Sequence, residues 1–190
     1  MTASISRALQ VSFDDEPLVL VDAEDNVTGF GDKAELHRGR GHRHRAFSIF
    51  LVRGNRVLMH RRSALKPLWP GCWTNSCCSH PRRGEDYESA TQRRLREELG
   101  VSAPLRFLYR FEYRADFAGG GAEHELCSVF LGELPEEHSP QPNPTEIDDW
   151  AWYEAEEIDA WVSRSSGELT PWFLLEWPRV RPFIAAQAAR

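Results

Sequence analysis

The chain of 190 residues has no apolar run close to the ~20 residues that a membrane-spanning helix requires. Its first residues, MTASISRALQVSFDDEP, contain no apolar stretch followed by a cleavage site, so they do not indicate a secretory signal. We therefore expect a cytoplasmic protein with no membrane partner. In that compartment cysteines stay reduced, which makes stable disulfides unexpected.

A positive net charge is also absent, because 23 Lys and Arg residues stand against 29 Asp and Glu residues and give −6 at pH 7. A general nucleic-acid binder is expected to be basic, so we expect no nucleic-acid partner. Local basic runs such as HRGRGHRHR can still hold a small anion.

The four cysteines include no C-x-x-C pair, which argues against a zinc ribbon. Yet the stretch WPGCWTNSCCSHP, residues 69–81, brings three cysteines, two tryptophans and a histidine together. This stretch allows four interpretations: a structural zinc site, a disulfide, an ordinary core segment, or a reactive thiol in a shielded pocket.

The hydrophobic pattern predicts both strands and helices, without internal repeats. The predicted elements are two strands within 18–30, a hairpin over 46–62 that turns at Gly54-Asn55, a helix over 85–100, strands over 105–116 and 123–134, a short helix over 154–162, and two helical pieces within 170–190. Pro178 and Pro182 limit those last pieces.

These elements predict one α/β (α+β) domain over residues 1–190, with a mixed β-sheet flanked by helices. Residues 1–15 are a candidate disordered tail. The proline-rich stretch LPEEHSPQPNPTE is the best candidate linker, but too little chain follows it to form an independent domain.

The predicted helix carries most of a known motif. Counted from Ser79, it resembles the Nudix box G-x5-E-x7-R-E-U-x-E-E-x-G-U, where U is bulky and aliphatic, with matches at Glu85, Arg93, Leu95, Glu97, Glu98, Gly100 and Val101. Carboxylates near the end of a helix can hold a hard divalent cation, which in turn holds a diphosphate. Taken alone, such carboxylates more often belong to a solvated helix face.

Two positions depart from the box: Ser79 replaces its first glycine, and Arg94 replaces the glutamate after the arginine. A cation at that position should weaken the metal cluster that activates water, and it can contact phosphate instead. The altered box therefore predicts a protein that binds a diphosphate without hydrolysing it.

Together with this box, the segments HRHRAFS, RRSALKPLWPGCWTNSCCSHP, YRFEYRAD, EHELCSVF and TPWFLLEW resemble the type 1 isopentenyl-diphosphate isomerases of the Nudix superfamily. The resemblance extends from about Leu18 to Trp177. It implies a Nudix-type fold and an isomerase of isoprenoid biosynthesis that interconverts isopentenyl and dimethylallyl diphosphate. Moving the double bond through a tertiary carbocation needs an acid on one face of the alkene, a base on the other, and no stray water.

The resemblance assigns the two proton-transferring groups to Cys78 and Glu125, with Tyr113 as a hydrogen-bonding partner of Glu125. Because side chains two residues apart in an extended segment share a face, Cys78 should point with His80, and Glu123 with Glu125. Which of Cys78 and Glu125 gives the first proton stays open. By pattern alone, the two glutamates also fit a solvated strand edge and Tyr113 a core position.

The resemblance also implies a metal site, formed by His37, His44, His80, Glu123 and Glu125. Such mixed nitrogen and oxygen ligands suit Mn²⁺ or Zn²⁺, with Mg²⁺ as a further candidate. A second cation, Mg²⁺, is expected to bridge the diphosphate and Glu98. His42 is interpreted as a surface residue. The other cysteines and histidines are expected to be structural or exposed: Cys72, Cys77, Cys127, His60, His124 and His138.

The diphosphate contacts that the resemblance implies are Arg62, Lys66 and Arg94, with weaker support for Arg82 and Arg83. The same resemblance places the indole of Trp177 over the hydrocarbon, where an aromatic face stabilises a cation by roughly 0.5–2 kcal/mol. Trp73 either adds to that wall or only packs.

Two other functions remain in view. One is a Nudix hydrolase that acts on a nucleoside diphosphate compound, and the other is a metal-stabilised domain that binds a diphosphate without catalysis. For each of them the partner is a small molecule, and we expect a monomer.

Overall fold

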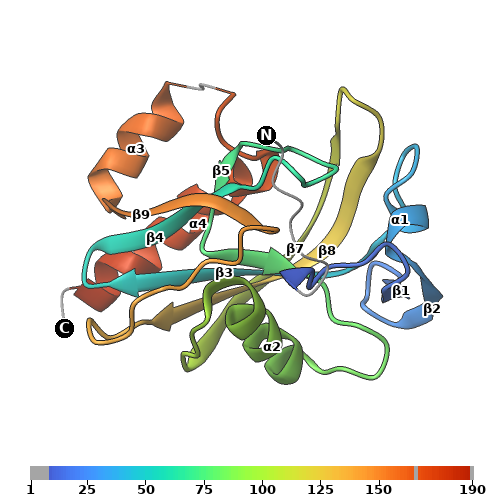
Figure 1. Cartoon of the computed structure of the whole chain (residues 1–190), viewed down its shortest axis with the longest axis horizontal. Coiled ribbons are helices and arrows are strands. Elements are labelled where there is room, and N and C mark those ends of the chain that lie inside the picture. The colour runs from blue at the N-terminus through green and yellow to red at the C-terminus, as the bar shows by residue number, and fades with distance from the viewer. Residues whose placement is uncertain (1–8, 165–166, 189–190) are drawn as a thin grey trace.

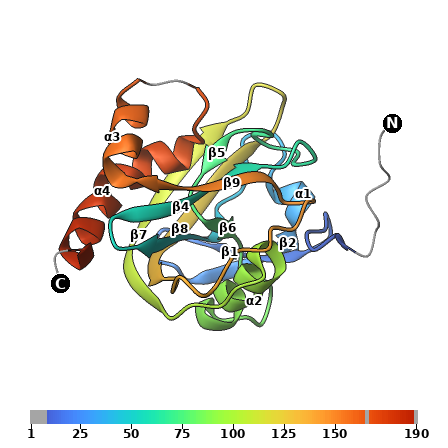
Figure 2. The same cartoon turned by 60° about the vertical axis from the view of Figure 1, so that its left-hand side comes forward.

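The computed structural model describes residues 9–164 and 167–188. Figure 1 shows a mixed β-sheet with helices on both faces. Helix α2 (Tyr87–Leu99) covers one face, and α3 (Ala155–Ser163) lies with α4 (Pro171–Ala188) on the other. The turned view in Figure 2 shows α3 and α4 together on one side. This arrangement confirms the predicted fold class.

The sheet is built around one central strand. In chain order the remaining elements are β1 (Pro17–Val21), β2 (Val27–Asp32), the short helix α1 (Lys33–Leu36), β3 (His44–Arg53), β4 (Arg56–Arg62), β5 (Trp73–Thr74), β6 (Cys77–Ser79), β7 (Leu105–Asp116), β8 (Ala122–Glu133) and β9 (Ile147–Glu154). The path β2-β1-β3-β4-β5 forms the sheet, and β3 also pairs antiparallel with β6 and parallel with β8. Strand β7 pairs with β8, and β9 pairs with β4.

Strand β3 is apolar on both faces because both of its faces are covered. Its alternate residues enter two separate cores: Ala46, Phe50 and Val52 toward α4, and Phe47, Ile49 and Leu51 toward α2. Apart from Ala46, each of these fully buried side chains contributes about 1.5–3 kcal/mol. By the same alternation, Ser48 is a polar residue on the α4 side.

The predicted hairpin of β3 and β4 is present, but its strands soon separate. They pair only at Val52 with Val57 and at Arg53 with Arg56. Farther from the turn, β3 pairs with β6, while β4 pairs with β5 and β9. This separation matters for function, because side chains from the separated strands line the main cavity.

Helix α2 follows its sequence signals closely. The Asp86 side chain accepts a hydrogen bond of 2.8 Å from the Ser89 N–H, which caps the N-terminus. Gly100 ends the helix with φ of 66°, a conformation that favours glycine. Ala90, Leu95 and Leu99 are buried, so the apolar face of the helix is the one that packs on the sheet.

The C-terminal region differs from the expectation of two helical pieces. Helix α4 is continuous from Pro171 to Ala188 and contains both Pro178 and Pro182. An interior proline removes one hydrogen bond and costs about 3 kcal/mol. Both prolines are exposed, so water can hydrate the freed carbonyls, and burial of the opposite face offsets the cost. The buried residues of that face are Trp172, Phe173, Glu176, Trp177, Val180 and Ile184. In the described part of the chain, no helix is long and apolar enough to cross a membrane.

The proline-rich stretch is packed against the domain and does not act as a linker. The Gln141 N–H donates to the Leu99 carbonyl at 2.7 Å, and the Asn143 N–H donates to the Glu98 carbonyl at 2.8 Å. The stretch leads into β9, a strand that the sequence did not predict. Residues 9–15 of the candidate tail also contact the domain, whereas residues 1–8 lie outside the described residues.

Candidate active site

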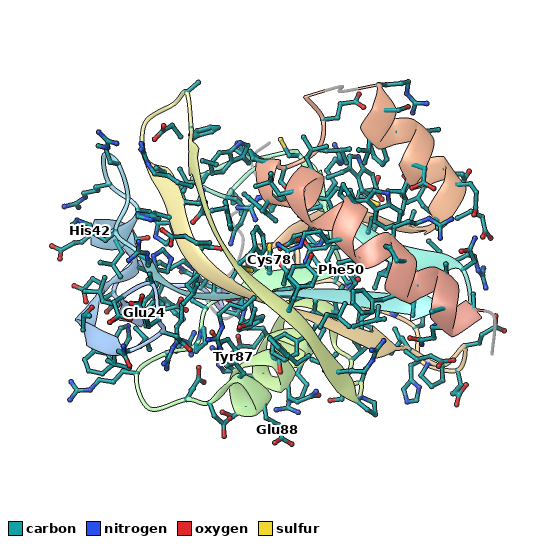
Figure 3. All side chains as sticks on the ribbon, turned by 180° about the vertical axis from the view of Figure 1, so that it is seen from behind. Glu24, His42, Phe50, Cys78, Tyr87 and Glu88 are labelled. Atoms are coloured by element: carbon teal, nitrogen blue, oxygen red, sulfur yellow. The ribbon has the colours of Figure 1, made fainter. Side chains whose placement is uncertain are left out.

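A cavity of about 900 Å³ is the centre of the candidate site. Cys78 and Glu125, the two groups that the family resemblance assigns to proton transfer, both line it. The surrounding walls come from distant segments: Ser48 from β3, Arg62 from the end of β4, Cys78 from β6, Tyr113 from β7, and Glu123 and Glu125 from β8. Figure 3 labels Cys78 near the centre of the molecule, between the β7–β8 hairpin and α4.

A metal-binding cluster lies in the same cavity. Its donor atoms all lie within 4.8 Å of one another, and they belong to His37, His44, His80, Glu123 and Glu125. The family resemblance implied this same set of five. His42 is not among them, and Figure 3 shows it at the edge of the molecule.

Two of the imidazoles are oriented by the backbone. Nδ1 of His37 donates to the Lys33 carbonyl at 2.6 Å, and Nδ1 of His44 donates to the His42 carbonyl at 2.7 Å. Each ring therefore turns Nε2 toward the cluster. Nε2 of His44 is buried and has no hydrogen-bond partner among the described residues. An outer hydrogen bond on one nitrogen and a free lone pair on the other is the usual arrangement of a metal-ligating histidine, so these residues fit a divalent cation.

The charges of the cluster also favour a cation. Burial lowers the pKa of His44 to about 3, so this imidazole is neutral and able to ligate. Burial would raise the pKa of Glu123, but the neighbouring His37 holds it at about 2. Burial and then the Glu123 carboxylate raise the pKa of Glu125 well above its ordinary value. Two carboxylates on one strand face repel each other, and a bound cation would relieve that repulsion.

The thiol of Cys78 is partly buried and faces the cavity. Burial raises its pKa to about 12, although the nearby Arg62 guanidinium acts in the opposite direction. Nη1 of Arg62 lies 3.8 Å from Sγ of Cys78. Cys77 belongs instead to the core beneath α2, as the period of two predicts. At neutral pH Cys78 therefore carries a proton.

The Glu125 carboxyl group is held on both oxygens. The Tyr113 hydroxyl donates to Oε2 at 2.8 Å, and Nε2 of His80 lies 2.9 Å from Oε1. The structure thus brings Tyr113 and Glu125 into the contact that the resemblance implied. Glu125 is both a member of the metal cluster and a wall of the cavity.

Lys66 and Arg94 line another part of the cavity together with Glu146, an acidic partner that the sequence analysis did not predict. Nζ of Lys66 lies 2.7 Å from Oε2 of Glu146, and Nη2 of Arg94 lies 3.2 Å from the same oxygen. Burial would raise the pKa of Glu146, but Lys66 and then Arg94 hold it at about 2. Glu146 closes a proline-rich loop, and no local pattern in the sequence marked it as part of a site.

Arg94 is the residue that separates this site from the standard Nudix box. It is 2% exposed, lines the cavity, and its Nη2 lies 2.6 Å from Oε1 of Glu98. Its Nη1 donates to Oε2 of Glu97 and to the Val11 carbonyl, at 2.9 and 3.0 Å. Glu98, expected as a magnesium ligand, is bound to Arg94 and is not among the described residues that line the cavity.

Lys33 is a further residue of the cavity that the sequence did not select, and it is a cation. It lines the cavity, contacts the Ser12 hydroxyl, and lies 3.4 Å from Glu16. Burial and then the nearby Lys66 lower its pKa to about 8. Lys33, Lys66 and Arg94 together make this part of the cavity suitable for a diphosphate.

Arg62 has a different set of contacts from these cations. Its Nε and Nη2 donate to the backbone carbonyls of Trp69 and Leu68, at 3.1 and 2.8 Å. Arg82 pairs with Glu16, and Arg83 lies over the Phe30 ring; neither is among the described cavity-lining residues.

Trp177 is not where the resemblance put it. It is 2% exposed, donates its indole N–H to Asp159 at 2.7 Å, and is absent from the described cavity lining. Trp172 lines the cavity instead, and its ring centroid lies 6.3 Å from that of Tyr113. On a continuous helix, five residues correspond to about 140° of rotation, so Trp172 and Trp177 point to different parts of the core that α4 covers. Trp73 packs against Tyr153 and Trp161.

The fold and this cavity define a Nudix domain, and a family model described as NUDIX domain matches residues 42–173. Two solved structures share the fold. DR0079 from Deinococcus radiodurans has a TM-score of 0.70 at 23% identity and covers 86% of this chain and 98% of its own. The MutT protein from Methanosarcina mazei Go1 has a TM-score of 0.60 at 14% identity, and the match covers 74% of this chain and 94% of that protein.

Curated relatives narrow the class. The chain is 39% identical to isopentenyl-diphosphate Delta-isomerase 1 of Photorhabdus laumondii, over 85% of this chain and 93% of that protein. It is 43% identical to the isopentenyl-diphosphate Delta-isomerase of Rhodobacter capsulatus, over 80% of this chain and 87% of that protein. The chain belongs to the type 1 isopentenyl-diphosphate Delta-isomerase family of the Nudix superfamily.

Proposed function

We propose that this chain interconverts isopentenyl diphosphate and dimethylallyl diphosphate in isoprenoid biosynthesis. One observation carries the proposal: the Cys78 thiol and the Glu125 carboxyl group line one cavity, beside a five-residue metal cluster. The relatives at about 40% identity are named for this activity, which supports it. The proposal includes one domain over residues 1–190, acting as a monomer.

The reaction needs one proton added and one removed. The π electrons of the terminal alkene bond a proton at the end carbon, which leaves a tertiary carbocation at the next carbon. Loss of a proton from the neighbouring methylene then forms the internal double bond. Cys78 and Glu125 are the groups that exchange these protons, and the Tyr113 hydroxyl hydrogen-bonds the Glu125 carboxyl group throughout. No proton is gained or lost overall.

The carbocation must be shielded from water and from reactive groups. Trp172 and Tyr113 supply aromatic surface beside Cys78 and Glu125. An indole face can stabilise a cation by roughly 0.5–2 kcal/mol when water is excluded. Trp172 therefore takes the role that the resemblance gave to Trp177.

The His/Glu cluster suits Mn²⁺, Zn²⁺ or Mg²⁺. When bound, such an ion supplies positive charge that favours the ionised form of Glu125 and fixes its position. Lys33, Lys66 and Arg94 are the proposed diphosphate contacts, with Mg²⁺ as their companion ion on the diphosphate. Arg62, next to the thiol, borders the same cavity.

Hydrolysis of a diphosphate compound is the rival function, and Arg94 argues against it. The guanidinium stands where the box has a carboxylate, and it occupies Glu97 and Glu98 through hydrogen bonds. These carboxylates are then less available to hold a water-activating metal. A phosphate-release assay with a panel of nucleotides should give no product.

The direct test is incubation with isopentenyl diphosphate and Mg²⁺ in heavy water. Dimethylallyl diphosphate carrying deuterium is the expected product. Cys78→Ala should lose isomerisation and keep its circular dichroism spectrum, whereas Cys77→Ala, changed in the core on the opposite face, should retain it. Near-normal turnover by Cys78→Ala would contradict the assigned role, and binding without label exchange would contradict catalysis.

A further inference from the structure

Glu176 is a buried acid that the proposed mechanism does not use. It belongs to α4, is 0% exposed, and forms no ion pair with any described Lys, Arg or His side chain. Its Oε2 has no hydrogen-bond partner among the described residues. An uncompensated carboxylate in an apolar core is strongly unfavourable, so such a group persists in its neutral form.

The polar groups around Glu176 lead from α4 to the cavity. The Cys127 thiol lies 3.7 Å from Oε1 of Glu176 and 3.5 Å from the Ser48 hydroxyl. The Ser48 hydroxyl is also close enough to the Glu176 carboxyl group to lower its pKa. Ser48 in turn lines the cavity.

Ser48 faces the same space as the reactive thiol. It lies directly opposite Cys78 in the antiparallel ladder of β3 and β6. Side chains of directly opposed residues project to the same side, with Cβ atoms about 4.5–5.5 Å apart. Both residues line the cavity, so a hydroxyl at position 48 faces the same space as the sulfur.

We infer that Glu176 is a positioning residue for the isomerase: its neutral carboxyl group donates to Oγ of Ser48 and thereby directs the Ser48 O–H toward the sulfur of Cys78. A serine hydroxyl has one donor hydrogen and two acceptor lone pairs. If a neutral acid occupies one lone pair, the single hydrogen is free to point into the cavity. The inference rests on the proposed function.

The surroundings of Glu176 support its neutral form. Ser48 of β3, Cys127 of β8 and Tyr109 of β7 face it, and Tyr109 donates to its backbone carbonyl at 3.3 Å. Arg179 lies on its own helix, and on the cavity side Glu176 contributes to raising the pKa of Cys78 and of Glu125. Burial raises the pKa of Glu176 to about 8 against the weaker effects of Ser48, Cys127 and Arg179.

Three variants of the holoenzyme test this inference: Glu176→Leu, Glu176→Gln and Ser48→Ala. Glu176→Leu and Ser48→Ala should lower kcat by roughly 10-fold or more, because misdirected groups at a reacting centre have effects of that order. KM should stay within about 2- to 3-fold, since the diphosphate cations are elsewhere in the cavity. Glu176→Gln can still donate to Ser48 and should restore most of kcat.

The double variant Ser48→Ala with Glu176→Leu distinguishes positioning from packing. If Glu176 acts through Ser48, its kcat should be no lower than that of Ser48→Ala alone. Losses that multiply, or normal kcat in Glu176→Leu, would overturn the inference. A wild-type chain that gives no labelled product would overturn the proposed function and this inference together.

If Glu176→Leu does not fold, the pH profile of the nearly isosteric Glu176→Gln decides. Above pH 8 an ionised Glu176 would accept the Ser48 hydrogen and turn it away from the cavity. Lys33 also has a pKa of about 8 and is present in both chains, so the wild-type kcat should fall more steeply than that of Glu176→Gln as the pH rises through about 8. Superimposable profiles would overturn the inference.

Discussion

Arg94 holds several buried acids together at the end of α2. Its guanidinium contacts Glu97, Glu98 and Glu146 while remaining 2% exposed. The ion pairs at Glu98 and Glu146 are buried too, so they are poorly screened by water or salt. Removal of one partner from a buried pair leaves an uncompensated charge, which is far more costly than loss of an exposed pair.

Arg94→Met should therefore lower the free energy of unfolding by about 3–5 kcal/mol. Arg96→Met is the matched control, because Arg96 lies in the same helix but is exposed, and its effect should stay within about 0.5 kcal/mol. Urea titrations of both variants measure the difference. Equal effects would show that the buried network does not stabilise the fold.

Glu176 should make stability depend on pH. Burial raises its pKa to about 8 from 4.5, so between these values the folded chain keeps a proton that the unfolded chain has released. The stability due to the protonated group is complete below pH 4.5 and is lost as the pH rises toward 8. The loss is at most about 1.4 kcal/mol per pH unit.

Glu176→Gln lacks this equilibrium and should gain stability relative to the wild type as the pH rises from 4.5 to 8, with no further gain above 8. Urea titrations of both chains over that range check the prediction. A stability difference that stays constant with pH would show that Glu176 does not hold a raised pKa in the folded chain.

At the scale of elements, local patterns predicted what local geometry decides. The period of two placed Cys78 with His80 and away from Cys77, and the helix predicted over 85–100 is present as α2. Patterns of this kind depend on neighbouring residues alone, so a single sequence contains them in full.

Long-range packing decided the features that the sequence could not predict. Glu146 reaches the cavity because β9 pairs with β4, a contact between segments far apart in the chain. Helix α4 continues through two prolines because its buried face is strongly apolar, and this continuity puts Trp172 rather than Trp177 at the cavity. The family resemblance supplied the metal ligands, which local spacing alone would have left open.

The C-terminal end of α2 gives an element-scale prediction. Gly100 has φ of 66°, and an added Cβ would lie 3.1 Å from Cβ of Gln141. Gly54 has a similar φ of 56° with nothing within 4 Å. Each Gly→Ala substitution should lower the free energy of unfolding by about 1 kcal/mol through backbone strain. Gly100→Ala should lower it further, because Gln141 must move. Thermal unfolding of the two variants measures the difference, and equal losses would show that the Gln141 contact adds nothing.

At the scale of the whole molecule, the metal cluster joins segments that are otherwise separate. His37 follows α1, His44 begins β3, His80 follows β6, and both glutamates come from β8. No single element contains the site, so its geometry exists only in the folded chain. An ion that binds this geometry must therefore stabilise the fold as a whole.

Addition of Mn²⁺, Zn²⁺ or Mg²⁺ to chelator-treated protein should raise the thermal unfolding midpoint. The free energy of unfolding should rise by about 2.7 kcal/mol when the free ion is at 100 times its dissociation constant. His37→Ala removes one ligand and should reduce the shift strongly. His42→Ala, in the same loop but outside the cluster, should leave it unchanged, because the backbone carbonyl that orients His44 remains. If both variants keep the full shift, the ions bind elsewhere and the five residues are not the metal site.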